Sequence, residues 1–136
     1  MVEFEVSKII IDEKSQEQVI VLKEKEGQRL LPIVIGINEA AAIRMKFGGF
    51  SPPRPLTHDL LKSLIDSLDA KLEKIVIDEL VDSTFHAKLM LKTEKGASKR
   101  IDARPSDSIA LAVRTQAPIF IEEEVLNKSS FPGMQI

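Results

Sequence analysis

The chain of 136 residues carries a net charge of −2, and 43% of its residues are hydrophobic, which is typical of one globular domain with its own core. The near-neutral charge argues against a protein that mainly coats DNA, and the absence of cysteine excludes disulfide frameworks and thiolate metal sites. No apolar run approaches the ~20 residues of a membrane helix, and the start of the chain is acidic where a signal peptide is basic. We therefore expect a cytoplasmic protein without a membrane partner.

The composition also bears on thermal stability. Charged residues make up 29% of the chain, and the thermolabile residues cysteine and asparagine are absent or scarce, which is often seen in proteins from thermophiles. A melting midpoint in the mesophile range of about 45–65 °C would contradict this hypothesis.

Alternation of apolar and polar residues between turn signals predicts most of the strands. In chain order, we expect strands at Val2–Asp12, Gln18–Lys23, Leu30–Ile35, Leu72–Asp82, Thr84–Thr93, Ile101–Ala103 and Pro118–Ile121. The third of these is apolar at both parities, which predicts cover on both faces. Pro32 within it cannot donate to a ladder, so this strand is expected at an edge or a bulge.

Helical spacing predicts helices at Glu39–Lys46, at His58–Leu68, from Pro105 onward and at Glu122–Asn127. The expected sources of capping oxygens are Asn38, Thr57 and Ser106, with Asp107 adding negative charge near a positive helix end. In the second helix, apolar residues share one face that we expect to be buried: Leu60, Leu61, Leu64, Ile65 and Leu68. The third helix is apolar on every side over residues 109–113, which predicts burial around most of its circumference.

Strands punctuated by helices, with short connections, predict a single α+β domain with a mostly antiparallel or mixed sheet and three to four helices. Three strands followed by an alanine-rich helix occur twice, which indicates two βββα halves; chance similarity of the two units is the alternative. We expect the domain to span residues 1–127 and residues 128–136 to form a poorly ordered tail.

Several common catalytic signatures are absent from the sequence, among them GxGxxG, the P-loop, HExxH and GxSxG. Three polar clusters remain, and the first is Thr57-His58-Asp59, just after a proline-rich loop. In one interpretation Thr57 and Asp59 serve the helix terminus and His58 is an incidental surface residue. In the other, His58 is a general base or proton shuttle, and Asp59 is a metal ligand or an orienting group.

The second cluster lies around the turn between the fourth and fifth strands and contains Asp78, Asp82 and His86. Asp82 is followed by serine and threonine, which is typical of a turn. His86 falls on the non-core face of its strand by parity. A structural role for Asp82 and a solvated or interface position for His86 are therefore favoured over catalysis.

The third cluster contains Asp102, Arg104 and Asp107, where a strand meets a helix. An arginine between two carboxylates can be a structural bracket. Alternatively, Arg104 binds a phosphate oxygen while Asp102 or Asp107 coordinates a divalent cation. Arg54 in the proline-rich loop is a candidate for a second phosphate contact, with simple solvation as its alternative. The residues alone do not decide between these interpretations.

Four segments of the chain resemble the bifunctional nuclease domain family: RLLPIVIGINEAAAI, PRPLTHDLL, LVDSTFHAKLML and RIDARPSDSIALAVRTQAPIFIEEEVL. They follow the family's order, and the likeness extends over residues 2–126. The family includes small bacterial proteins and plant proteins credited with cleaving both RNA and DNA. Through this resemblance, the family-characteristic positions are Glu39, His58, Asp59, Asp82, Asp102, Arg104, Ser106 and Asp107.

The resemblance implies a nuclease that acts on RNA, DNA or both. Our hypothesis adds a divalent cation such as Mg²⁺ or Mn²⁺, which we expect on the carboxylates of Asp59, Asp102 and Asp107. His58 would activate water, and the expected substrate contacts are Arg104, Arg54 and Ser106. The resemblance also implies a homo-oligomer, often a dimer. The alternative is a non-catalytic oligomeric module that binds a ligand or a protein, in which the same charges form structural brackets.

Overall fold

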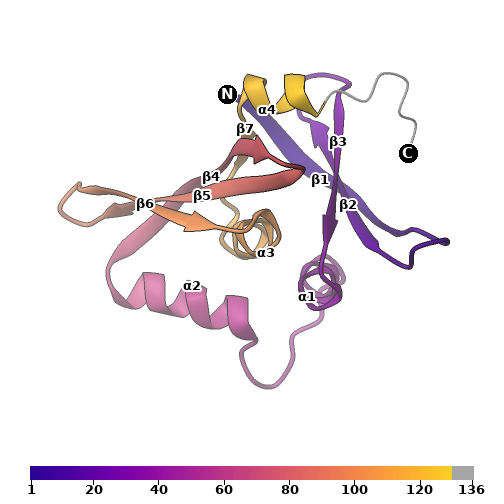
Figure 1. The fold of residues 1–136 in the computed structure, drawn as a ribbon. Coiled ribbons are helices and arrows are strands. Elements are labelled where there is room, and N and C mark those ends of the chain that lie inside the picture. Colours follow the sequence, from indigo (N-terminus) through magenta and orange to yellow (C-terminus); the bar gives the residue numbers. More distant parts are fainter. Residues whose placement is uncertain (130–136) are drawn as a thin grey trace.

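A seven-stranded sheet forms the framework of the molecule (Figure 1). The computed structural model describes residues 1–129. The strands are β1 (Val2–Ile11), β2 (Gln18–Glu24), β3 (Leu30–Ile35), β4 (Ala70–Val81), β5 (Thr84–Thr93), β6 (Ser98–Ala103) and β7 (Ile119–Ile121). They follow the expected segments closely, which confirms the strand predictions.

The sheet has the order β3-β2-β1-β7-β4-β5-β6. Its neighbours are antiparallel except for β4 and β7, which run parallel. The short β7 joins two three-stranded units, β1–β2–β3 and β4–β5–β6. Helix α1 (Ile37–Phe47) follows the first unit, and helix α3 (Pro105–Thr115) follows the second. The expected α+β class and the two βββα units are therefore confirmed as topology, and the strand that contains Pro32 lies at an edge as predicted.

The helices α1, α2 (Thr57–Ser67) and α3 lie on the same side of the sheet, whereas α4 (Glu123–Lys128) lies beside the N-terminus (Figure 1). Helix α3 is central, because it packs against α1, α2, β4 and β5. Residues 109–112 of α3 are almost completely buried, as their apolar pattern predicts. The polar first turn of α3 is thus attached to the most deeply buried helix of the fold.

The helix starts differ from the expected caps. The residues at the N-cap positions of the first three helices are Gly36, Leu56 and Arg104, and none forms a side-chain capping bond. The prediction that Asn38, Thr57 and Ser106 would cap these helices is therefore wrong. Pro105 stands at the first helical position, where its missing N–H costs nothing.

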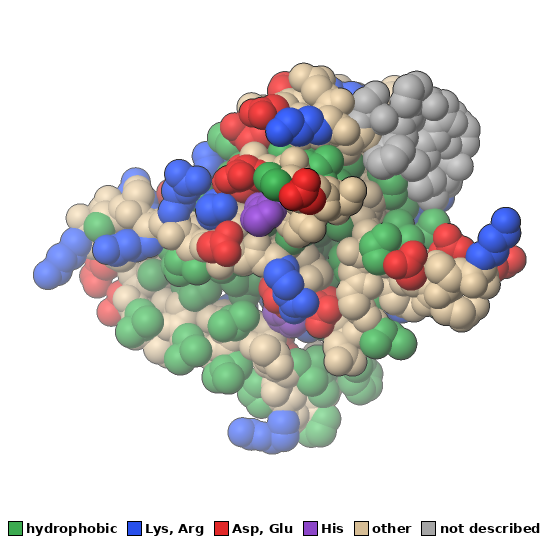
Figure 2. Space-filling model, in the orientation of Figure 1, with side chains coloured by type: hydrophobic (Ala, Val, Ile, Leu, Met, Phe, Trp, Pro, Cys, Tyr) green, Lys and Arg blue, Asp and Glu red, His purple; other side chains and the backbone are tan. Residues whose placement is uncertain are grey.

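One predicted face of α2 is not buried in this chain. Leu60, Leu61, Leu64 and Leu68 are 53%, 37%, 49% and 76% exposed, and Figure 2 shows hydrophobic side chains gathered over α2. Among the predicted stripe, only Ile65 packs against the core, and the helix buries His58 instead. The prediction fails because an amphipathic pattern does not say whether the chain's own core or another surface covers the apolar face.

The edge strand β3 also differs from expectation. Val34 is 56% exposed, so the predicted cover on both faces is wrong at this residue. Within residues 1–129, β3 is an edge strand that pairs with β2. Its apolar composition therefore reflects one buried face rather than two.

The C-terminal end of the described chain belongs to the fold. Lys128 ends α4, and Ser129 is buried with its Oγ donating to the carbonyl of Val125 at 2.7 Å. The remainder of the expected tail, residues 130–136, lies outside the described residues. Across residues 1–129, no helix is both long enough and apolar enough to cross a bilayer.

Candidate active site

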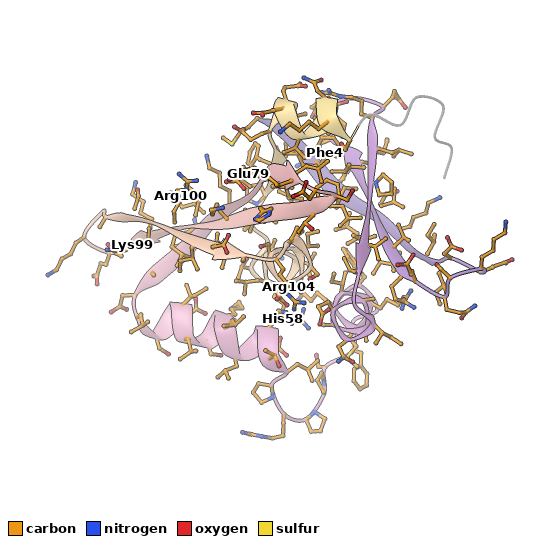
Figure 3. The ribbon with its side chains drawn as sticks, viewed as in Figure 1. Phe4, His58, Glu79, Lys99, Arg100 and Arg104 are labelled. Carbon is orange, nitrogen blue, oxygen red and sulfur yellow. The ribbon has the colours of Figure 1, made fainter. Side chains whose placement is uncertain are left out.

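A cavity of about 690 Å³ opens between α1, α2, α3 and the end of β6. Figure 3 shows Arg104 and His58 close together in this region, below α3 and between α1 and α2. The polar lining residues are Asn38, Glu39, Thr57, His58, Asp102, Arg104 and Asp107. The apolar lining residues are Ala41, Ala42, Met45, Leu56, Leu61, Leu89, Ala103 and Leu111. The fold thus brings parts of two separate predicted clusters to one concave surface.

Three side chains in this cavity form a connected group, His58–Asp107–Arg104. Nε2 of His58 lies 3.0 Å from Oδ1 of Asp107. Nε and Nη2 of Arg104 donate to Oδ2 of the same carboxylate at 3.0 and 2.8 Å. One carboxylate therefore holds both the imidazole and the guanidinium.

The charge state of the group follows from these contacts. Burial alone would raise the pKa of Asp107, but the hydrogen bonds with His58 and Arg104 outweigh burial and hold this pKa below its usual value. The hydrogen bond to Asp107 in turn raises the pKa of Arg104. An ionised carboxylate beside Nε2 favours the tautomer with its proton on Nε2, which leaves Nδ1 of His58 as an acceptor. Within residues 1–129, Nδ1 has no hydrogen-bond partner.

Arg104 is anchored on one side and open on the other. Its side chain is 67% exposed, and Nη2 lies 4.0 Å from Oε2 of Glu39 on α1. Its Nη1 has no partner among the described residues. A guanidinium held in this way can donate to an oxygen of a bound phosphate, because its fork geometry matches that group.

Asp102 lines the cavity but belongs to a different charge network. Its carboxylate is 77% exposed, and Oδ1 lies 3.3 Å from Nζ of Lys88. The same ammonium lies 3.4 Å from Asp78 on the adjacent strand. Asp102 makes no ion pair or hydrogen bond with His58 or Asp107, so the structure separates it from the group that the sequence placed it in.

Asp59 does not line this cavity, and its carboxylate contacts Leu56 and Arg114 instead. Oδ2 accepts the backbone N–H of Leu56 at 2.9 Å, and Oδ1 accepts Nε–H of Arg114 at 2.8 Å. The backbone hydrogen bond is the main cause that lowers the pKa of Asp59, with Arg114 adding to it. Asp59 thus stabilises the start of α2, which is the helix-terminus role that its position allowed.

The sequence interpretation did not include Arg114, which organises the helices around the site. Its side chain is only 5% exposed. Besides Asp59, it donates to the carbonyls of Ala110 and Ala42 at 3.0 and 3.2 Å, so it links α1, α2 and α3. The available signal was a lone arginine at the end of an otherwise apolar helix, since a buried arginine needs partners.

The three carboxylates expected to hold a metal do not come together. Asp59 lies outside the cavity, Asp102 pairs with Lys88, and both oxygens of Asp107 are engaged. Across residues 1–129, no group of three or more His, Asp or Glu side chains is placed to hold a metal ion. The side chains therefore do not fit a resident metal on the expected ligand set.

The other predicted residues lie outside the cavity. Ser106 is buried in the first turn of α3, and Arg54 is exposed in the loop between α1 and α2. Asp82 is exposed at the β4–β5 turn with a φ of 50°, followed by Ser83 at 66°, which agrees with a turn role. His86 is half-buried on β5, opposite Glu79 on β4.

Comparison with known proteins places the chain in a family. The family model described as the bifunctional nuclease domain matches residues 20–133. The chain belongs to the bifunctional nuclease domain family. An uncharacterized protein of Mycobacterium tuberculosis is 43% identical over 126 residues, which is 93% of this chain and 74% of that relative. The bifunctional nuclease match includes all three residues of the His58–Asp107–Arg104 group.

Plant members of the bifunctional nuclease family are more distant and longer. Bifunctional nuclease 2 of Oryza sativa subsp. japonica is 26% identical over 118 residues, which is 85% of this chain and 36% of that relative. Bifunctional nuclease 1 of Arabidopsis thaliana is 28% identical over 107 residues, which is 76% of this chain and 33% of that relative. The chain therefore spans about a third of the length of these plant relatives.

Proposed function

We propose that the protein is a nuclease that hydrolyses phosphodiester bonds of RNA, DNA or both in the cavity around His58. The observation that carries this proposal is the His58–Asp107–Arg104 group, which places a proton acceptor and an anion-binding guanidinium on one carboxylate. Membership of the bifunctional nuclease family and the printed names of the plant relatives support it.

The proposed roles follow from the chemistry of phosphodiester hydrolysis. Nη1 of Arg104 donates to a non-bridging oxygen of the scissile phosphate and offsets the charge that develops there. Nδ1 of His58 takes the proton of the attacking water as the new P–O bond forms and the bond to the leaving oxygen breaks. The leaving oxygen takes a proton from solvent, and His58 returns its proton to solvent. Asp107 keeps the imidazole in the required tautomer and stabilises its protonated form.

A divalent cation such as Mg²⁺ or Mn²⁺ is part of the proposal, with its ligands revised. The described residues offer no cluster of three ligands, so the cation would enter with the substrate. Mg²⁺ often binds in this way, through one or two carboxylates together with substrate phosphates. Glu39, which lines the cavity and has a side chain that is 16% exposed, is the carboxylate without a short contact.

The non-catalytic module is the second candidate, and one observation favours it. Asp59, Asp102 and Asp107 are each paired with a cationic side chain, as structural brackets would be.

The exposed leucine face of α2 supports the dimer that both candidates include. Leu60, Leu64 and Leu68 are spaced by four residues and form a ridge, and such ridges pack into the grooves of a second identical helix.

Cleavage of labelled single-stranded RNA and DNA, with Mg²⁺, with Mn²⁺ and with chelator, tests the proposal. Wild type is compared with His58→Gln and Asp107→Asn, and we expect each variant to lose about 10²–10⁴-fold in rate. His86→Gln and Asp82→Asn are matched controls, because they change the same residue types outside the cavity. Circular dichroism melting checks that the variants fold.

Each outcome of this assay has a clear meaning. Cutting that persists in His58→Gln and Asp107→Asn would place the activity elsewhere or in a contaminant. No cutting by wild type on any substrate would favour the binding module. Cutting that survives the chelator would remove the divalent cation from the proposal and leave the His58–Asp107–Arg104 group in place.

A further inference from the structure

A second cavity of about 250 Å³ adjoins the candidate active site at the loop between α1 and α2. Figure 1 shows this loop at the lower end of the molecule. Met45 and Leu56 line both cavities, so the two are direct neighbours. Asp59 and Arg114 line the second cavity only and form its rigid inner side through their 2.8 Å contact.

The second cavity carries an excess of positive charge. Its lining includes Lys46, Arg54 and Arg114, of which only Arg114 is neutralised, by Asp59. Within residues 1–129, Lys46 and Arg54 form no ion pair and no side-chain hydrogen bond. Arg29, Arg100 and Arg104 pair with carboxylates, whereas Arg44 at the end of α1 is unpaired among the described residues, as Arg54 is. Two unpaired cations beside a cavity in a chain of net charge −2 favour an anionic ligand.

An aromatic ring lies in the same lining. Phe50 is 58% exposed. Aromatic residues are few in this chain, which has no tryptophan or tyrosine and only six phenylalanines. Single nucleic-acid strands are bound by this combination, with cations along the backbone and aromatic rings under the bases. Bases in a duplex are already stacked on each other and are not free to use such a ring.

We propose that the cavity lined by Lys46, Phe50 and Arg54 binds the nucleotide next to the scissile phosphate of a single strand. The cations hold its phosphate, and the ring of Phe50 stacks on its base. This inference rests on the proposed function, because the neighbouring cavity would hold the scissile phosphate. A free nucleotide has the same chemistry, so the experiment must separate the two sources.

Fluorescence anisotropy with a labelled single-stranded octanucleotide tests this site. Phosphorothioate linkages keep the charge of the strand and resist hydrolysis during the measurement. Phe50→Ala and Arg54→Ala are compared with Phe47→Ala and Arg44→Ala. These controls change the same residue types at the end of α1, with Phe47 61% exposed, but they line a different cavity. All four side chains are exposed, so melting temperatures should match wild type.

We expect Phe50→Ala and Arg54→Ala each to raise the Kd by about 5- to 30-fold, and Phe50→Tyr to keep near-wild-type binding. Arg54→Ala should also lower the slope of log Kd against log salt by about 0.7, the value for one phosphate contact on a single strand. The two control variants should bind within about twofold of wild type.

Three results would overturn the proposal. The first is that wild type and both cavity variants bind the octanucleotide equally well. The second is that a duplex binds as tightly as the single strand. The third is that adenosine monophosphate displaces the octanucleotide at concentrations near the Kd of the octanucleotide itself. The last would assign the cavity to a free nucleotide. If Phe50→Ala and Arg54→Ala weaken binding but wild type cleaves no substrate, the result would support this cavity and contradict the nuclease. If wild type cleaves its substrate but both cavity variants bind as wild type does, the result would contradict this cavity and leave the nuclease in place.

Discussion

Nε2 of His58 lies 3.0 Å from Oδ1 of Asp107, although the two residues belong to the first turns of different helices. The contact exists because α2 and α3 pack against each other and Arg114 ties both of them to α1. The candidate site is therefore a product of helix packing. Changes in that packing should affect activity as well as stability.

His58 and Asp107 should act as a unit in cleavage. We expect His58→Gln, Asp107→Asn and the double variant to have similar kcat/KM values, because removing either partner already disables the pair. Single-turnover and steady-state kinetics on a short labelled strand measure this coupling. Losses that simply add in the double variant would show that the two residues work independently.

Removal of the Arg114 side chain should destabilise the fold strongly. Arg114→Leu loses hydrogen bonds to two carbonyls and leaves Asp59 without its cation, so we expect the free energy of unfolding to fall by about 2–4 kcal/mol. Urea denaturation with an unchanged m-value measures the effect. Arg44→Leu, at an exposed position, should change stability by less than about 0.5 kcal/mol. Equal effects of the two substitutions would contradict the structural role of Arg114.

Stability should fall at acidic pH through Asp59 and Asp107. Both pKa values are lowered in the fold, so folding favours the ionised carboxylates. Their contribution is therefore fully present above the ordinary carboxyl pKa of about 4 and is lost as the pH falls through the folded-state values. We expect the urea midpoint to fall as the pH is lowered below about 4. Asp59→Asn should show a shallower dependence of this midpoint on pH. Asp66→Asn, an exposed carboxylate on the same helix, should follow the wild-type curve.

The leucine ridge of α2 should control the oligomeric state. We expect Leu60→Gln with Leu64→Gln to convert the proposed dimer to monomer in size-exclusion chromatography with light scattering. The isolated chain should lose little stability, since these side chains are 53% and 49% exposed without a partner. Ile11→Gln, 50% exposed at the end of β1, is the matched control. A wild-type monomer at every concentration, or equal dissociation by the control, would contradict the dimer interface.

Much of the fold is visible in local patterns. Alternation located β1 to β6 closely, because side chains on a half-buried strand repeat every two residues. The all-round apolar stretch in α3 correctly predicted its burial. The pairing of β7 with β1 and β4 was not predictable, because a strand of three residues has little pattern of its own and its partners lie far away in the chain.

The leucines of α2 show a second kind of limit. Their spacing indicates an apolar helix face, and the helix has one. Periodicity describes which side chains share a face and carries no information on what covers that face. The packing of α2 against α3 and β4 decided that His58 turns inward and the leucines turn out.

At the site, local pattern was sufficient for contacts within one segment. Arg104 and Asp107 are three residues apart across a helix start, and they form an ion pair, which was one of the two interpretations that the sequence left open. Tertiary structure decided three other contacts, which join Asp107 to His58, Asp102 to Lys88 and Asp59 to Arg114. The physical reason is that a carboxylate binds the nearest suitable donor in space. Only the packing of the helices on the twisted sheet determines which donor that is.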